Sequence, residues 1–156
     1  MELILWRHAD AEPHGFGQDR DRKLTPLGEK QAAKMAHILK MRLPSSDLTI
    51  YCSPALRCRQ TVNALQIPYI TSPKLDTDAS VLELLELTDW HSDSVSKHTI
   101  LVCSHQPTLG QTVSTILTGQ PHYWTFKKGS IWWLSSRIRG HDSNAWVRVV
   151  LTPDIL

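Results

Sequence analysis

Short apolar runs rich in β-branched residues alternate along this chain with longer segments in which apolar residues recur at helical spacing. The clearest runs predict strands over residues 2–6, 48–52 and 99–103, and a helical segment follows each of them. Such alternation is typical of βα units, in which parallel strands form a sheet and the connecting helices cover it. We therefore predict an α/β fold, a three-layer sandwich with a mostly parallel central sheet and helices on both faces.

Residue pairs that cap helices mark two of the predicted helix starts. Thr25-Pro26 and Ser53-Pro54 each combine a favoured N-cap residue with a proline that suits the first helical turn. The helix after Ser53-Pro54 is expected to extend through about Leu65.

The second half of the chain is less regular. Apolar residues at helical spacing over 109–117 predict a third helix, and residues 79–87 are compatible with a short one. Residues 89–98 are polar and predict no element. The runs 130–134 and 145–151 are rich in Ile, Trp and Val, so we expect two strands that pair near an edge of the sheet.

Length and composition limit the class of protein. The 156 residues are 41% hydrophobic and contain no linker or repeat, so residues 1–156 are expected to fold as a single domain. A net charge of +2 is too small to predict nucleic-acid binding. No apolar run approaches the roughly 18 residues of a membrane span and no signal peptide is evident, which predicts a cytoplasmic protein without membrane contact. The three cysteines lack the spacing of a disulfide framework or zinc knuckle and are expected to be free thiols.

Cationic or titratable side chains follow all three predicted strands. Arg7 and His8 come directly after the first strand, Arg57 shortly after the second, and His105 after the third. Because ligands bind beyond the carboxyl ends of parallel strands, we expect these side chains to converge there. Two arginines and two histidines would form an anion pocket, and guanidinium groups match phosphate oxygens with paired hydrogen bonds. The sequence therefore predicts a phosphate site.

Three ordered motifs carry a family resemblance: R-H-A at residues 7–9, S-P-x-x-R-x-x-Q-T at 53–61 and S-H-x-P at 104–107. Together with L-T-x-x-G at 24–28 and K-G-S-I at 128–131, they make the chain resemble the histidine phosphatase superfamily. It is most similar to the SixA-type phosphohistidine phosphatases. The resemblance runs from about residue 2 to residue 134 and implies that the domain is a histidine-phosphatase-like catalytic domain.

The resemblance implies a metal-independent phosphatase that needs no cofactor. His8 would attack phosphorus as a neutral imidazole and form a phosphohistidine intermediate, while Arg7, Arg57 and His105 would bind the phosphoryl oxygens. The expected partner is a phosphorylated protein that carries phosphohistidine, or a small phosphorylated substrate. The sequence predicts no oligomeric state.

The chain departs from the family pattern in two places. Ala9 stands where these proteins usually carry glycine, and no glutamate between the second and third motifs has a recognisable motif context. Glu83 and Glu86 are candidates for the general acid, although either could equally be a solvated helix residue, and Asp10 is the other nearby acid. A phosphorylated imidazole leaves with a pKa of roughly 6.5, so it needs less protonation than an alcohol. A weak acid therefore favours phosphohistidine as the substrate.

Other enzyme classes fit the sequence less well. A cysteine-dependent phosphatase needs an arginine six residues after its cysteine, but Cys58 and Leu109 occupy that position after Cys52 and Cys103. None of the eight histidines forms the H-x-x-x-H pair of many zinc enzymes. Two alternatives stay open: a catalytically weak module that binds phosphate or a phosphoprotein, and a phosphatase for small phosphate esters.

Overall fold

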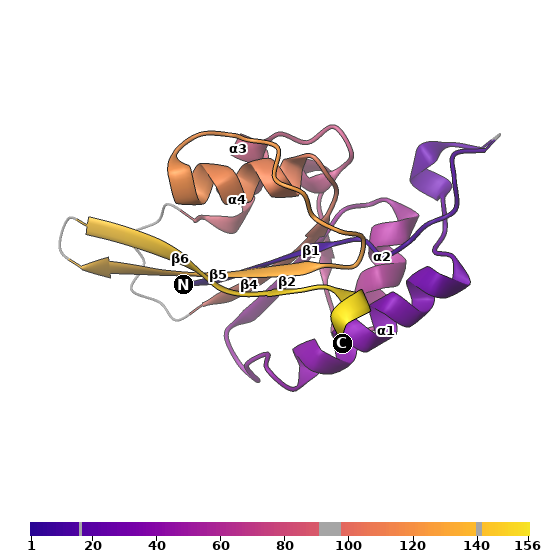
Figure 1. The fold of residues 1–156 in the computed structure, drawn as a ribbon, viewed down its shortest axis with the longest axis horizontal. Helices are drawn as coiled ribbons and strands as arrows, with labels where there is room; N and C mark the ends of the chain where they lie inside the picture. Colours follow the sequence, from indigo (N-terminus) through magenta and orange to yellow (C-terminus); the bar gives the residue numbers. More distant parts are fainter. Residues whose placement is uncertain (16, 91–97, 140–141) are drawn as a thin grey trace.

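Six strands form one mixed sheet in the computed structural model of the protein, which describes residues 1–15, 17–90, 98–139 and 142–156 (Figure 1). The sheet has the strand order β3-β2-β4-β1-β5-β6. The strands are β1 (Glu2–Arg7), β2 (Leu48–Cys52), β3 (Ile70–Thr71), β4 (Thr99–Ser104), β5 (Ile131–Arg139) and β6 (Asp142–Leu151). Pairing is parallel from β3 through β2 and β4 to β1, and antiparallel from β1 to β5 and from β5 to β6. The predicted α/β class is confirmed, and the two late strands pair at one edge as expected.

Helices cover both faces of this sheet (Figure 1). They are α1 (Pro26–Lys40), α2 (Leu56–Asn63), α3 (Val81–Thr88) and α4 (Thr108–Thr118), with short 3₁₀ turns η1 (Asp19–Asp21), η2 (Pro73–Leu75) and η3 (Pro153–Ile155). Helices α1 and α2 pack on one face, and α3 and α4 pack on the other. The three-layer sandwich is therefore confirmed.

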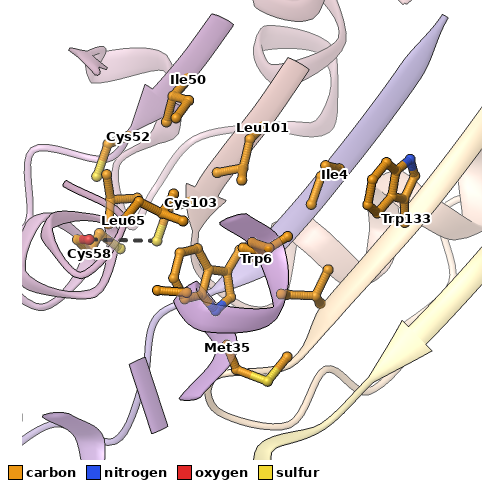
Figure 2. Close-up of a cluster of buried hydrophobic side chains, with 14 residues drawn as sticks. Ile4, Trp6, Met35, Ile50, Cys52, Cys58, Leu65, Leu101, Cys103 and Trp133 are labelled. Atoms are coloured by element: carbon orange, nitrogen blue, oxygen red, sulfur yellow. Dashed lines mark hydrogen bonds between the residues drawn. The ribbon is translucent and has the colours of Figure 1, made fainter. Parts of the chain in front are cut away.

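Alternation along β1 divides the core between the two faces, because successive side chains of a strand point in opposite directions. Ile4 and Trp6 pack with Met35 of α1, whereas Leu3 and Leu5 pack toward α3 and α4. Figure 2 shows the first of these clusters, which includes all three cysteines. All three thiols are free and buried, as the sequence predicts. Burying an aliphatic side chain such as that of Leu3, Ile4 or Leu5 contributes about 1.5–3 kcal/mol. Strand β1, in which all three are fully buried, is therefore a central source of stability.

The two predicted helix caps have different outcomes. Thr25 is the N-cap of α1 and its side chain accepts a hydrogen bond from the Gly28 amide, as expected. The prediction for Ser53-Pro54 is wrong, because α2 begins at Leu56 with Ala55 as its N-cap and ends at Asn63. The Ser53 amide instead donates to the Cys103 carbonyl oxygen at 2.9 Å, which keeps the chain beside β4 for one more residue.

The segment 89–98, for which the sequence predicts no element, lies mostly outside the described residues. Among the helices that the structure describes, none is both long and apolar enough to cross a membrane.

Candidate active site

The carboxyl ends of β1 and β4 bring two histidines together. The strands are parallel, and Arg7 at the end of β1 is in register with Ser104 at the end of β4. The His8 amide continues this pairing by donating to the Ser104 carbonyl oxygen at 3.2 Å. As a result the rings of His8 and His105 lie with their centroids 5.3 Å apart.

His8 is held as a neutral imidazole. The ring is 6% exposed, and Nδ1 lies 2.8 Å from the Ala9 carbonyl oxygen. A carbonyl can only accept, so Nδ1 carries the proton and the lone pair is on Nε2. Burial lowers the pKa of His8 to about 3, and the nearby His105, Arg57 and Arg7 act in the same direction against the hydrogen bond to Ala9. A nucleophilic nitrogen is therefore available across the neutral pH range.

Arg57 reaches His105 from the first turn of α2. Its Nη2 lies 3.2 Å from His105 Nδ1, and a guanidinium can only donate, so Nδ1 is the acceptor. Nε2 of His105 then donates to Ser53 Oγ at 2.8 Å. Arg57 is 2% exposed, and its charge is fixed beside both histidine rings.

Arg7 approaches from β1. Its Nη1 donates to the Phe126 carbonyl oxygen at 2.6 Å, and burial lowers its pKa without removing its charge at neutral pH. In the part of the chain that the structure describes, the Nε atoms of Arg7 and Arg57 are both buried without a hydrogen-bond partner. Buried donors of this kind cost on the order of 1–3 kcal/mol each when unpaired.

Ala9 fits the position that glycine usually occupies. Its side chain packs with Ala11, Leu24 and Ala32, and it is not among the residues with positive φ. Its amide donates to Thr61 Oγ1 at 3.0 Å. The methyl group therefore leaves the loop after β1 in place.

The three candidate acids are engaged elsewhere. Asp10 accepts from Lys128 Nζ at 2.6 Å and from Thr25 Oγ1 at 2.7 Å, and these contacts hold its pKa below the ordinary value. Glu83 closes a capping box with Ser80 at the start of α3, which likewise lowers its pKa.

Glu86 is exposed and pairs with Lys74 at 3.1 Å.

Of the residues predicted for the site, the structure brings Arg7, His8, Arg57 and His105 together. Among the described residues, no hydrogen bond or ion pair joins Glu83 or Glu86 to those four.

Two residues at the site were not predicted from the sequence. Ser53 accepts from His105, as described above, and Asp19 in η1 contacts Arg57. Asp19 Oδ2 lies 3.0 Å from Arg57 Nη2, and the Asp19 carbonyl oxygen accepts from Arg57 Nη1 at 2.8 Å. The sequence alone could not assign this role to Asp19, because no spacing rule links a loop carboxylate to a helix 38 residues later.

Within the described ranges, no group of three His, Cys, Asp or Glu side chains is arranged to hold a metal ion. The four central residues are instead two arginines and two histidines that lie close together, an arrangement suited to binding an oxyanion.

Comparison with known protein families gives one match. The family model described as the histidine phosphatase superfamily (branch 1) matches residues 3–92, which is more than half of the 156-residue chain. A search of curated proteins found no match.

Similar solved structures share the whole fold. A Nakamurella multipartitia protein assigned as phosphohistidine phosphatase SixA has a TM-score of 0.77 at 26% identity, with 97% of this chain and 95% of that chain covered. A protein histidine phosphatase SixA complexed with tungstate has a TM-score of 0.78 at 24% identity, with 99% of each chain covered.

A phosphoserine phosphatase from Entamoeba histolytica has a TM-score of 0.71 at 18% identity, with 99% of this chain and 98% of that chain covered. The family match and these folds, taken with the paired histidines and arginines at the strand ends, lead to one conclusion. The chain belongs to the histidine phosphatase superfamily.

Proposed function

We propose that this protein is a phosphohistidine phosphatase that acts through a phosphorylated His8. The observation that carries the proposal is the neutral imidazole of His8, with Nε2 unprotonated, among Arg7, Arg57 and His105. A nucleophile beside fixed cations is the arrangement that phosphoryl transfer requires, because catalysis there consists largely of positioning and charge stabilisation.

In the first step the Nε2 lone pair of His8 attacks phosphorus. The bond between phosphorus and the substrate breaks, and its electron pair leaves with the substrate's nitrogen or oxygen. The Ala9 carbonyl oxygen accepts from Nδ1 throughout, so it supports the positive charge that develops on the His8 ring.

The cations hold the group that is transferred. Phosphoryl oxygens placed between Arg7 and Arg57 would accept hydrogen bonds from the two guanidinium groups. His105 lies beside these cations and is positioned by Ser53 and Arg57.

In the second step water attacks the phosphorus of phospho-His8. The P–N electron pair returns to Nε2, and inorganic phosphate leaves. Neither step needs a metal ion, since Arg7 and Arg57 supply the positive charge.

The contacts of the three candidate general acids indicate the class of substrate. Asp10, Glu83 and Glu86 are held by other partners, so the site favours a leaving group that needs little protonation. Imidazole is such a group, and similar structures include proteins described as SixA. We infer that a histidine side chain of a protein donates the phosphoryl group. The cytoplasmic location stays a prediction from the sequence.

Phosphate release tests the proposal. Wild type is expected to release phosphate from a phosphohistidine-bearing protein domain and from p-nitrophenyl phosphate, with full activity in the presence of EDTA. H8A is expected to lose on the order of a thousandfold or more, while H37A, which alters an exposed histidine of α1, retains wild-type rates. A wild type inactive on both substrates would favour the phosphate-binding module. Hydrolysis of p-nitrophenyl phosphate alone would favour small esters.

A further inference from the structure

The carboxylate of Asp19 lies next to Arg57 at the candidate active site. Asp19 Oδ2 lies 3.0 Å from Arg57 Nη2, which is the same nitrogen that donates to His105. The other carboxylate oxygen of Asp19 accepts from Arg22 Nε at 2.9 Å. The site that we propose binds a phosphoryl anion therefore already contains a carboxylate anion.

Asp19 is reachable from solvent where Arg57 is not. The side chain of Asp19 is 39% exposed, compared with 3% for Arg57. The carboxylate is therefore the solvent-accessible partner of a buried guanidinium.

Asp19 remains ionised in this setting. Burial alone would raise its pKa, but Arg57 and Arg22 outweigh burial and hold the pKa below its ordinary value. A permanent negative charge at this point repels a dianionic phosphate ester and attracts a cationic group on a substrate.

We propose that Asp19 is the specificity-determining residue that makes this site select phosphorylated imidazole, protonated on its ring, over phosphate monoesters. The inference rests on the proposed function and names the form of the substrate. The Asp19 carboxylate binds the positively charged ring of phosphoimidazole, while Arg7 and Arg57 bind its phosphoryl oxygens.

The charges balance in the transfer step. His8 Nε2 forms a bond to phosphorus as the P–N bond of the substrate breaks. The electron pair of that bond returns to the substrate ring, which already carries its proton on the other nitrogen. The ring therefore leaves as neutral imidazole, and the positive charge passes to the His8 ring, where Nδ1–H donates to the Ala9 carbonyl oxygen.

This route explains why the three candidate acids are engaged elsewhere. A substrate that arrives protonated needs no separate proton donor, so Asp10 is free to bind Lys128 and Glu83 to cap α3. An alkyl phosphate would still need an acid to protonate its leaving oxygen.

The test compares D19N with D21N. Asparagine keeps the shape of the side chain and removes its charge, and Asp21 is an exposed carboxylate in the same 3₁₀ turn. We expect D19N to lower kcat/KM for phosphoimidazole about tenfold, the loss of one charged contact. The ratio of kcat/KM for phosphoimidazole to kcat/KM for p-nitrophenyl phosphate should therefore fall, whereas D21N should match wild type on both substrates.

Equal losses of kcat/KM on both substrates would mean that Asp19 only holds Arg57 in place. Wild-type values of kcat/KM on both substrates would mean that the charge of Asp19 is irrelevant. Either result overturns the inference. D19E, which keeps the charge, is expected to recover selectivity, and failure to do so counts against it. Failure of the proposed function looks different: wild type would not hydrolyse phosphoimidazole, or H8A would still do so.

Discussion

At the scale of single residues, His8 links the chemistry to stability. An unfolded chain protonates a histidine near pH 6.5, but burial in the folded protein lowers the pKa of His8 to about 3. Between these two values the unfolded state binds a proton that the folded state does not. The stability that His8 contributes is therefore fully present above about pH 6.5 and falls as the pH decreases toward 3.

A urea titration at two pH values measures this linkage. Between pH 7.5 and pH 5 the wild type should lose about 2 kcal/mol more of its free energy of unfolding than H8A loses. Identical losses in the two proteins would show that His8 is not buried as a neutral ring.

The four residues of the pocket could be predicted from the sequence because each follows a strand. Arg7 ends β1, and His8 and His105 come directly after β1 and β4, so the parallel strands place all three at one edge. Asp19 and Ser53 could not be predicted in their roles. Their contacts with Arg57 and His105 depend on how a loop and a strand end fold against the sheet.

At the scale of elements, the L-T-x-x-G segment has a packing role. Helix α1 passes so close to the loop after β1 that a Cβ on Gly28 would lie 1.9 Å from the Asp10 carbonyl oxygen. Only glycine allows this approach, which holds the segment after His8 against α1.

G28A is therefore expected to destabilise the protein by roughly 1–3 kcal/mol, the range for overpacked sites. The matched control is G17A, because a Cβ at Gly17 meets nothing within 4 Å. Thermal unfolding followed by circular dichroism measures both. A G28A variant as stable as G17A would contradict the close packing of α1 on this loop.

Helix boundaries show what local signals can and cannot predict. Thr25-Pro26 capped α1 because the Thr25 hydroxyl can accept from the Gly28 amide at 3.0 Å while it donates to Asp10 Oδ2 at 2.7 Å. At Ser53 the same signal failed, since the Ser53 hydroxyl accepts from His105 and the backbone still pairs with β4. Tertiary contacts therefore delayed α2 to Leu56.

At the scale of the whole molecule, the pocket is an assembly of distant segments. Arg7 ends β1 and His8 follows it, Arg57 comes from α2, and His105 comes from the turn between β4 and α4. Strand β1 packs on the core at both faces, so it joins the helical layers to the point where these segments meet. The alternation of strands and helices predicts this architecture because it determines which strand ends share an edge.

The account depends most on a covalent phosphate on His8. Wild type mixed with phosphoimidazole, quenched within one turnover and digested under alkaline conditions, should yield a phosphorylated peptide that contains His8. That species should form and decay at rates that match phosphate release, and the corresponding peptide from H8A should carry no phosphate. Wild-type turnover without phosphorylated His8, or phosphate found on another residue at competent rates, would contradict the account.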